Sequence, residues 1–551
     1  MDTYLKKDTW KIRENANTSY SLSGLHMHIF ENETKKYMLD TYYKGKIATA
    51  YKQGHIHIHD MGYLSNYCCG HNLQTLLTEG LNGVPGQVSS TPPKHLRSAI
   101  NQMVNYLFVM QSENAGAQAF SNVDTLLSAL VKKENLSYHE VKQCMQEFIF
   151  SINFPTRSGL QSPFTNVTMD LKCPDMFKDQ EAVIGGEKSG IKYGECNKEI
   201  GMISKAFFEI MMGGDAEGKP FTFPIPTVNL HENFVWDDEV AQTIFEATAK
   251  YGTANFQNFF NSDMDPQDSY SLCCRLRLDK RELVRNTGGT FGSSPNTGSI
   301  GVVTINLPRI AYETKDIGQF YEKLTDLMHI SKDSLEIKRA AITQHMDAGL
   351  YPYMKRYIGS FKTFFSTIGY IGMNEALISL IGKDITTAEG QDMAEKILMF
   401  MREQVADIQE DTGNLYNLEQ SPAEGASYKL AKRDKEDYPD IPTQGEEVPY
   451  YTNSSHMPVN CGMTMFKMLK TQETFNKHIN GGTACHVFLG QRVSDWINCM
   501  TLVKKIATRT TLPFFDLTPT FSMCPVHGYI SGEHKTCPLE HTQEQLEKYG
   551  V

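Results

Sequence analysis

Apolar and polar residues alternate most clearly within residues 55–59, where two isoleucines stand between three histidines. A period of two is typical of a β-strand that turns one face to a core and the other to a polar space. Apolar residues at helical spacing over 30–53 precede it, and a glycine-containing bend leads from it to Cys68 and Cys69. The pattern predicts a helix, a short strand and a bend that points a cysteine into a shared space.

The same two periodicities continue along the chain and indicate its fold class. Strands and helices alternate from residue 221 onward, which favours parallel strands joined by crossover helices. The sequence therefore predicts an α/β protein with a large barrel or a doubly wound sheet. The predicted helices are 94–131, 135–151, 198–212 and 237–260, and the predicted strands are 160–171, 221–230 and 300–307.

Charge and composition exclude some classes of function. A net charge of −11 over 551 residues argues against a primary role in binding nucleic acid or a membrane surface. No apolar run reaches transmembrane length and the first residues lack the apolar core of a signal peptide, so a cytoplasmic protein is predicted. The 12 cysteines are scattered, which in a reducing compartment indicates thiol chemistry at a few sites and packing elsewhere.

Two stretches carry candidate chemistry. The histidines of residues 55–59, followed by Asp60, are metal ligands, a substrate-orienting surface or one polar strand face; zinc ligands usually come from separated segments, which disfavours the first. The vicinal Cys273 and Cys274 precede a Gly-, Ser- and Thr-rich segment, 287–298. Such a loop offers N–H groups to phosphate, but it matches neither the P-loop nor the dinucleotide fingerprint.

Seven short segments, in this order, resemble the anaerobic, class III ribonucleoside-triphosphate reductases. Each segment is weak alone, but their joint occurrence over nearly the whole chain is specific. The segments are His-Ile-His-Asp at 57–60, Tyr-Cys-Cys-Gly at 67–70, Cys-Arg-Leu at 274–276, the strand and turn 298–309, the stretch 412–425, Tyr-Tyr-Thr-Asn-Ser at 450–454, and Cys-Pro-Val-His-Gly-Tyr at 524–529.

The resemblance implies a ten-stranded α/β barrel, of the type shared with glycyl radical enzymes, around a central finger loop. It also implies reduction of ribonucleoside triphosphates to 2′-deoxyribonucleotides by radical chemistry. Cys68 would be the transient thiyl radical at the finger tip, and Cys274 would help to remove the 2′ hydroxyl from the opposite face. Asn306 would hydrogen-bond near the sugar. A weak S–H bond in a water-poor cavity suits hydrogen-atom transfer.

The neighbouring cysteines bear on the reductant. We interpret Cys69 as a packing residue. Cys273 either packs or is a second thiol that lets a redoxin-type donor replace formate. Because vicinal cysteines form a strained disulfide ring, formate is favoured.

Two further loops and a helical region acquire roles from the resemblance. For the residues of these two loops, turn and capping roles are the alternative. His456 stands at a loop position where the resemblance implies glutamine. The substrate-binding candidates are His59, Asn453, Ser454 and Ser455, with Glu419 and Glu424 as further candidates.

The helices predicted over 94–131 would form the contact of a homodimer and border a site for dNTP effectors. Gln111, Glu113 and Gly116 are the candidates there, and the small residues of 115–119 would be part of the interface. Plain helix packing is the alternative. The N-terminal ATP-binding cone of the family has no counterpart, so overall activity control through it is not expected.

The predicted organisation is a reductase body, 1–515, and a zinc-module-like segment, 516–551. In the latter, Glu540 stands where the family has a fourth cysteine, which leaves a Cys₂His₂ zinc site or a metal-free tail. The predicted ligands are Cys524, His527, Cys537 and His541, with His534 as a further nitrogen donor.

An Arg-Val-x-Gly-Tyr-like glycyl radical loop is absent from the sequence, and Gly550 stands in a different context. We therefore expect the radical to be supplied in trans, by a separate glycyl-radical fragment that a radical-SAM activase activates. The alternative is a nucleotide-binding relative or fragment without turnover. Cys68, Cys274 and Asn306 together favour the reductase.

Overall fold

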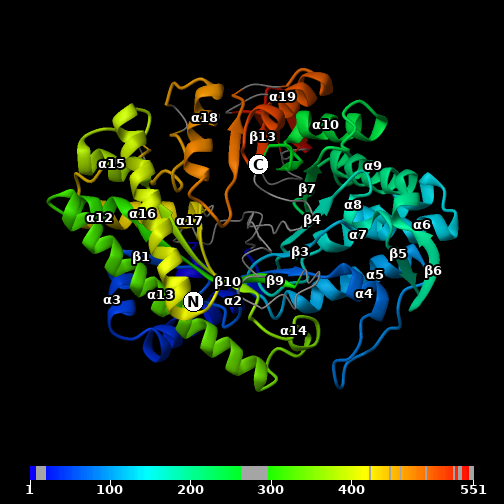
Figure 1. Ribbon diagram of the computed structural model, residues 1–551, viewed down its shortest axis with the longest axis horizontal. Coiled ribbons are helices and arrows are strands. Elements are labelled where there is room, and N and C mark those ends of the chain that lie inside the picture. Colours follow the sequence, from blue (N-terminus) through cyan, green and yellow to red (C-terminus); the bar gives the residue numbers. More distant parts are fainter. Residues whose placement is uncertain are drawn as a thin grey trace.

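An 11-stranded sheet forms the centre of the computed structural model. Ten strands follow one another in the order β11-β10-β9-β2-β3-β4-β7-β8-β13-β12, and β1 pairs with β9 beside them. Gly481 N donates to Leu418 O (2.8 Å) and Gln420 N donates to Gly482 O (2.9 Å), which joins β11 to the segment entering β12. The sheet thus closes into the predicted ten-stranded barrel, with helices around it (Figure 1). The structure describes residues 1–7, 20–261, 296–420, 423–445, 448–458, 461–490, 493–524, 526, 528–531 and 536–544.

The barrel consists of two halves that run in opposite directions. Paired neighbours within each half are parallel. The halves meet where β2 pairs antiparallel with β9 and β8 pairs antiparallel with β13. The first half contains β2 (Cys68–His71), β3 (Gln118–Phe120), β4 (Thr165–Met169), β7 (Ile225–Leu230) and β8 (Asn255–Asn258); the second contains β9 (Thr297–Asn306), β10 (Phe364–Ile371), β11 (Tyr416–Glu419), β12 (Cys485–Phe488) and β13 (Phe514–Thr518); β1 is Ile56–Ile58.

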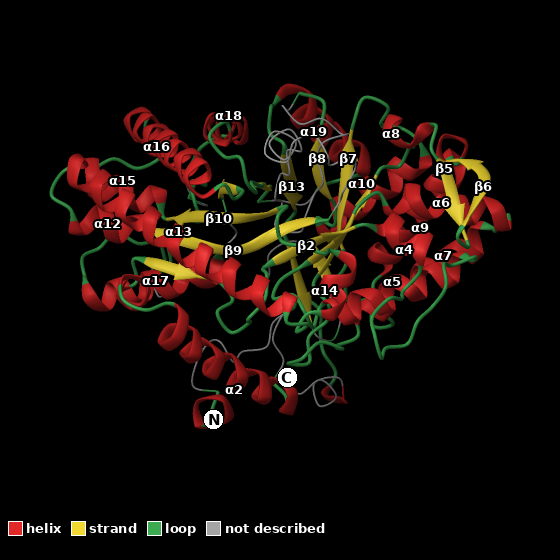
Figure 2. Cartoon of the chain, turned by 60° about the horizontal axis from the view of Figure 1, so that its bottom comes forward, coloured by secondary structure: helices red, strands yellow, loops and turns green. Residues whose placement is uncertain are grey.

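Helices cover the outside of each half and bury a separate apolar core against it. Figure 2 shows the two groups on either side of the strands. Around the first half lie α4 (Leu73–Glu79), α5 (Leu96–Met110), α6 (Val123–Glu134), α7 (Tyr138–Asn153), α8 (Asp175–Lys178), α9 (Asn197–Gly213), α10 (Glu239–Tyr251) and α19 (Trp496–Arg509). Around the second lie α3 (Lys46–Gln53), α12 (Leu307–Glu313), α13 (Ile317–Asp347), α15 (Met373–Ile381), α16 (Ala388–Thr412), α17 (Glu424–Asp437) and α18 (Met465–Asn476).

Smaller elements lie at the periphery. The predicted body boundary at residue 515 falls within β13, so the barrel extends to Thr518. Among the described helices, none is both long and apolar enough to cross a bilayer. The peripheral elements are α1 (Asp2–Leu5), α2 (Leu22–Tyr37), α14 (Pro352–Tyr357), the hairpin of β5 (Glu181–Ile184) and β6 (Glu187–Lys192), and the hairpin of β14 (Phe521–Cys524) and β15 (Gly528–Ser531).

Three predicted helices are interrupted, and each interruption has a local cause. The predicted helix 94–131 is wrong between α5 and α6, because its small residues form β3 and the approach to it. The predicted helix 237–260 ends at Gly252, whose φ of +66° terminates α10 before β8 begins. The predicted helix 30–53 breaks near Gly45, φ +63°.

The inner face of the barrel is polar although its strands are buried. All ten residues of β9 are buried, and Thr297, Ser299, Thr304 and Asn306 are among them. Parallel strands that are covered on both faces are usually near-continuous apolar runs. Polar side chains on such strands therefore indicate an interior that is used for something other than packing.

A buried ionic network fixes the end of β9. Arg309 Nη1 donates to Asp434 Oδ1 and to Asp437 Oδ2, both at 2.8 Å, and Arg309 Nε donates to Glu313 Oε1 at 2.9 Å. Tyr451 also donates to Asp434 Oδ2 (2.7 Å). Burial raises the pKa of Asp434, which these donors oppose. The network joins the start of α12 to α17.

Arg309→Met should destabilise the protein by about 3–5 kcal/mol, because it leaves the fully buried Asp434 carboxylate without its cation. Differential scanning calorimetry measures the effect as a lowered melting temperature. The matched control is Lys396→Met, which removes an exposed partner of Asp392 and should leave the melting temperature unchanged. An Arg309→Met protein as stable as the wild type would contradict the assignment.

Candidate active site

Cys68 is the first residue of β2, at the seam where the two halves of the barrel meet. It pairs with Ser299 of β9, and the next residue, Cys69, donates its N–H to Ala117 O (3.0 Å) on the other side. Cys68 is fully buried. The predicted position at a loop tip is therefore wrong, since strands hold this residue on both sides.

The two adjacent cysteines point to opposite faces of β2. Cys69 belongs to the apolar core beneath the first half, which confirms its packing role. Successive side chains of a strand alternate between faces, so Cys68 faces the barrel interior. Burial also raises the pKa of the Cys69 thiol well above its usual range, as expected in an apolar core.

Two glycines leave room for Cys68. A Cβ on Gly116 would lie 2.6 Å from Tyr67 O and 3.1 Å from Cys68 Sγ, and a Cβ on Gly298 would overlap Cys68 O. Neither position accepts a side chain without moving the strand. Gly116, which the sequence assigns to the effector region, thus lies against the cysteine instead.

The polar strand β1 brings two histidines to the same interior. Within this strand His57 is paired with Thr304 of β9, and His59 Nε2 lies 2.8 Å from Thr304 Oγ1. The rings of His57 and His59 are 4.7 Å apart. Burial, together with the charges of Lys338 and Lys429, lowers the pKa of His59 to about 4. His59 is therefore a neutral imidazole at physiological pH.

The metal interpretation of these histidines is not supported. His55 is directed to Glu313, 2.7 Å from Nε2 to Oε2, away from the other two. In the described part of the chain, the single group of His, Cys, Asp and Glu gathered closely enough for a metal lies elsewhere. The strand instead presents His57 and His59 as one polar face.

Asn306 is committed to the buried network. Its Nδ2 donates to Gly54 O (2.9 Å) and to Asp434 Oδ2 (2.7 Å), and its Oδ1 accepts from Arg309 N (3.4 Å). The side chain is fully buried. A sugar contact by Asn306 would require this amide to leave the network, at the loss of its hydrogen bonds to Gly54 and Asp434.

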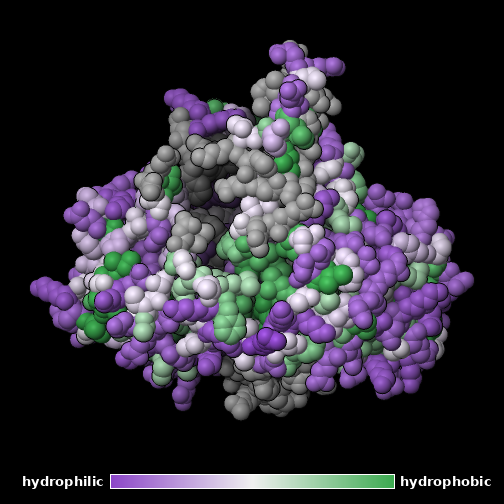
Figure 3. Space-filling view, turned by 90° about the horizontal axis from the view of Figure 1, so that it is seen from above, coloured by the Kyte–Doolittle hydropathy of each residue, from purple (hydrophilic) through white to green (hydrophobic). Residues whose placement is uncertain are grey.

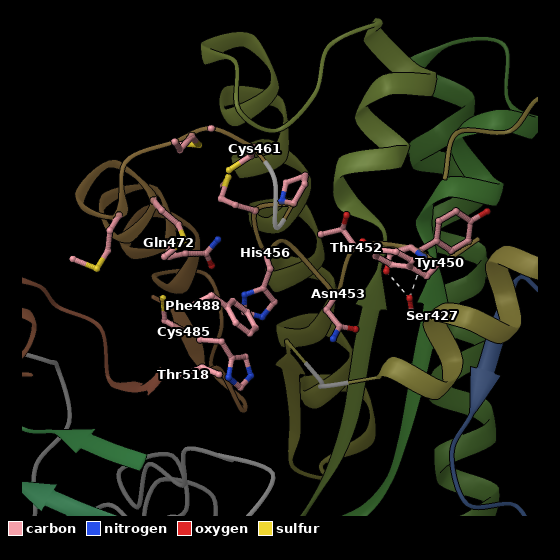
Figure 4. Close-up of a pocket in the computed structure, with 18 residues that line it drawn as sticks. Ser427, Tyr450, Thr452, Asn453, His456, Cys461, Gln472, Cys485, Phe488 and Thr518 are labelled. Carbon is pink, nitrogen blue, oxygen red and sulfur yellow. Dashed lines mark hydrogen bonds between the residues drawn. The ribbon is translucent and has the colours of Figure 1, made fainter. Parts of the chain in front are cut away.

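A cavity of about 590 Å³ opens beside β12 (Figure 4). Seen from above, the surface of the molecule has a hollow, and apolar side chains gather next to it (Figure 3). Asn453 and His456 line the cavity, and the ring of His456 lies 6.1 Å from that of His486. His486 Nδ1 is 2.8 Å from Asp516 Oδ2. The cavity also has an apolar lining, which we call the methionine wall: Met457, Met463, Met465, Met468 and Phe488.

Ser454 and Ser455 lie behind this cavity and not on its surface. Both are fully buried. Ser455 Oγ lies 2.8 Å from Tyr370 OH and accepts from Gln420 Nε2 at 2.6 Å. Ser454 O accepts from Met373 N at the start of α15 (3.0 Å). Of the three predicted loop residues, the structure brings Asn453 alone to the cavity; the two serines shape the loop.

The predicted effector residues separate in the structure. Glu113 accepts from Tyr353 N (3.1 Å) and Met354 N (2.7 Å) and so caps α14. Gln111 lines another cavity, of about 390 Å³, together with Arg157. Within the described residues Gln111 Oε1 is buried without a hydrogen-bond partner. A polar ligand in that cavity would satisfy this buried atom.

The C-terminal cysteines and a histidine come together. The ligand atoms of Cys524, Cys537 and His541 lie within 4.8 Å of one another, and Cys524 Sγ is 3.1 Å from His541 Nε2. Cys524 ends β14 and pairs with Gly528 across the hairpin. The thiolate and imidazole donors suit a tetrahedral metal. Three of the four predicted ligands thus form a possible metal site.

Some predicted residues lie outside the described part of the chain. These are Cys273, Cys274, His527, His534 and Gly550.

Lys338 is a buried residue near the cysteine that the sequence reasoning did not single out. It lies on α13, whose buried positions recur at helical spacing, and residue 338 falls on that face. The signal was therefore present, since a lysine at a core position of an amphipathic helix is uncommon.

Comparison with known proteins agrees with the sequence motifs. Residues 14–549 match the family described as anaerobic ribonucleoside-triphosphate reductase. The chain is 24% identical over 534 residues to the reductase of this name from bacteriophage T4, covering 87% of this chain and 81% of the relative. It is 24% identical over 479 residues to the Haemophilus influenzae reductase, covering 80% of this chain and 65% of the relative.

Solved structures share the fold. The anaerobic ribonucleotide reductase of Thermotoga maritima with MES in its active site superimposes with a TM-score of 0.76 at 22% identity, over 97% of this chain and 90% of that one. The same enzyme with dATP in its specificity site gives 0.72 at 23% identity, over 94% and 86%. A class Id reductase α subunit from Actinobacillus ureae gives 0.52 at 10% identity, over 94% and 96%.

Proposed function

This chain belongs to the anaerobic ribonucleoside-triphosphate reductases, oxidoreductases that form 2′-deoxyribonucleoside triphosphates from ribonucleoside triphosphates, and on this premise we propose that Cys68 is a reacting thiol. The observation that carries the proposal is its place at the β2–β9 seam, facing the interior. Full burial keeps water from a sulfur radical. The flanking Gly116 leaves room for the Cys68 sulfur, and Gly298 leaves room for the Cys68 carbonyl.

Cys274 is the proposed partner of Cys68. The described chain leaves β8 and returns at β9, and these strands stand on opposite sides of the barrel, with four strands between them in either direction. Cys273 and Cys274 fall between these strands in the sequence and outside the described residues, so their roles rest on the resemblance. Hydrogen abstraction by Cys68, formate as reductant, and a redoxin as the alternative remain predictions.

The ribonucleotide is proposed to bind between the seam and the cavity beside β12. His59 and Asn453 offer polar contacts, and the methionine wall offers an apolar surface for a base. A solved T. maritima neighbour holds dATP and CTP. That dNTP effectors bind at the Gln111 cavity is supported by the amide oxygen of Gln111, which is buried and has no hydrogen-bond partner among the described residues. The homodimer and the cytoplasmic location remain predictions.

Cys68→Ser should abolish deoxyribonucleotide formation by the activated enzyme, because an O–H bond is too strong for the transfer. Nucleotide binding, measured as the rise in melting temperature at millimolar ATP or CTP, should persist. The matched control is Cys69→Ala, which loses packing but should keep turnover. Product from Cys68→Ser, quantified by liquid chromatography, would refute the role of Cys68.

The C-terminal metal site is proposed to hold zinc, with Cys524, Cys537 and His541 as ligands and His527 as the fourth. When bound, zinc would tie the β14–β15 hairpin to the segment that follows it. It takes no part in the steps at Cys68.

Cys537→Ser should lower the zinc content of the purified protein from about one atom per chain to near zero, because a neutral hydroxyl is a poor substitute for thiolate. Inductively coupled plasma mass spectrometry measures the content. Cys461→Ser, which changes a cysteine outside the cluster, should retain the metal. Equal zinc in both variants would count against the site.

We propose that a radical-SAM activase generates the radical on a glycyl residue. The protein is incubated anaerobically with activase, S-adenosylmethionine and an electron source, with and without a polypeptide that carries a glycyl loop. If the radical is supplied in trans, the glycyl doublet in electron paramagnetic resonance and the deoxyribonucleotide appear with the added polypeptide alone. A doublet from the 551-residue chain by itself, lost in Gly550→Ala, would overturn the supply in trans.

A further inference from the structure

A cation is buried against Gly301 of β9, two residues along that strand from Ser299, which pairs with Cys68. Lys338 lies in the middle of α13 and is 4% exposed. Within the described part of the chain its ammonium has neither a hydrogen-bond nor an ion-pair partner, although other buried cations, such as Arg309 and Arg339, are bonded. An unpaired buried charge is costly, so its retention at this place calls for a ligand or a reaction.

The sheet is shaped to admit this side chain. A Cβ on Gly301 of β9 would lie 3.1 Å from Lys338 Cδ and 3.2 Å from Nζ, so the lysine passes where other residues carry a side chain. Immediately before it the register of β9 with β10 shifts, from Phe365 opposite Ser299 to Ser366 opposite Gly301. Ile300 is the extra residue of this bulge, a device that often re-aims side chains next to active sites.

The groups that face Lys338 come from separate elements. The ammonium interacts electrostatically with Cys68 of β2 and with Asp60, which follows β1 and has a φ of +49°. Its charge also helps to lower the pKa of His59. Asp60 is an exposed residue; desolvation by the surrounding protein nevertheless raises the pKa of its carboxyl, against the charges of Lys338 and Arg157. Lys429 and Arg157 are the other cations that act on these groups.

We propose that Lys338 is a positioning residue of the reductase, a cation that must be protonated for turnover and that, with Asp60, sets the electrostatic field at Cys68. This inference rests on the proposed function of Cys68. A preorganised ammonium in a water-poor interior stabilises negative charge that develops on the substrate oxygens or on sulfur, without reorganisation during the reaction. No bond to Lys338 forms or breaks.

The charge of Lys338 is poised to change near neutral pH. Burial lowers its pKa to about 8, against the opposing influence of Asp60 and Cys68. The fold therefore favours the neutral amine more than the unfolded chain does. The resulting destabilisation is full below pH 8 and disappears as the pH rises toward the usual lysine value. A group kept for packing alone would not be placed at this disadvantage.

The test compares Lys338→Met, Lys338→Arg and Gly301→Ala with Lys332→Met, which removes a partly exposed lysine, the partner of Asp333, from the same helix. In the activated enzyme Lys338→Met should lower kcat on the order of 10²-fold with KM nearly unchanged. Gly301→Ala should give a smaller loss, because its methyl displaces the ammonium. Lys338→Arg should retain turnover above pH 8, where the wild-type rate falls, because guanidinium stays charged. Lys332→Met should match the wild type.

Thermal unfolding of the unactivated proteins separates this proposal from that for Cys68. Lys338→Met should melt at a higher temperature than the wild type at pH 7, and the difference should vanish near pH 10. Wild-type kcat in Lys338→Met, or an unchanged alkaline limb in Lys338→Arg, would overturn the role. A lowered melting temperature at pH 7 would also overturn it. Absence of turnover in the wild type itself would instead refute the proposed function and leave the thermal result to decide whether Lys338 is a buried cation.

Discussion

The antiparallel pairing of β2 with β9 is the constraint on which the site depends. Each half of the barrel is parallel and could be extended by further crossover units, but a closed ring of two opposed halves requires such a seam. The register there places Cys68 opposite Ser299 and Cys69 opposite Gly298. Because side chains alternate, a slip of one residue would bury Cys68 in the helix-side core and turn Cys69 inward. The chemistry of the interior is therefore fixed by backbone pairing.

The chain segments at the seam can approach each other closely because glycines stand on both sides of β2. Gly298 admits the Cys68 carbonyl, and Gly116 admits Tyr67 O and the Cys68 sulfur. Glycine weakens a strand, since it packs no side chain and gains no rigidity. The loss is compensated at the far end of β9, where Asn306 and Arg309 tie the strand to Asp434. Strand β9, which glycine weakens at one end, is thus anchored at the other end by buried charged groups.

Elements with one uniform period were predictable from the sequence. The histidine strand, α7, α9 and β7 all follow their apolar pattern, and the motifs located Cys68 within the barrel. Where the sequence failed, a local preference yielded to tertiary pairing. Ala119 is a good helix former, but β2 and β4 lie on either side of it and pair with it as part of β3. No local signal reveals those partners.

The predicted substrate contacts of the two loop serines are not found at the cavity, for a different reason. Ser454 and Ser455 have the residue type and spacing of ligand contacts, and composition cannot tell a hydroxyl that meets a ligand from one that meets Tyr370. The distinction depends on which way a buried loop turns, and the positive φ of Ser454, +44°, decides it here.

Lys338 shows how stability and chemistry oppose each other at one position. The surrounding core would be better filled by methionine or leucine, because an ammonium that has no bonded partner among the described residues loses hydration there. Yet Gly301 and the bulge at Ile300 are arranged to let the lysine through, at a further loss of regular pairing. Two independent departures from a stable strand serve one side chain, with which Asp60 and Cys68 both interact electrostatically. Such concerted strain is expected where selection acts on the electrostatic field at a reacting atom and not on the stability of the core.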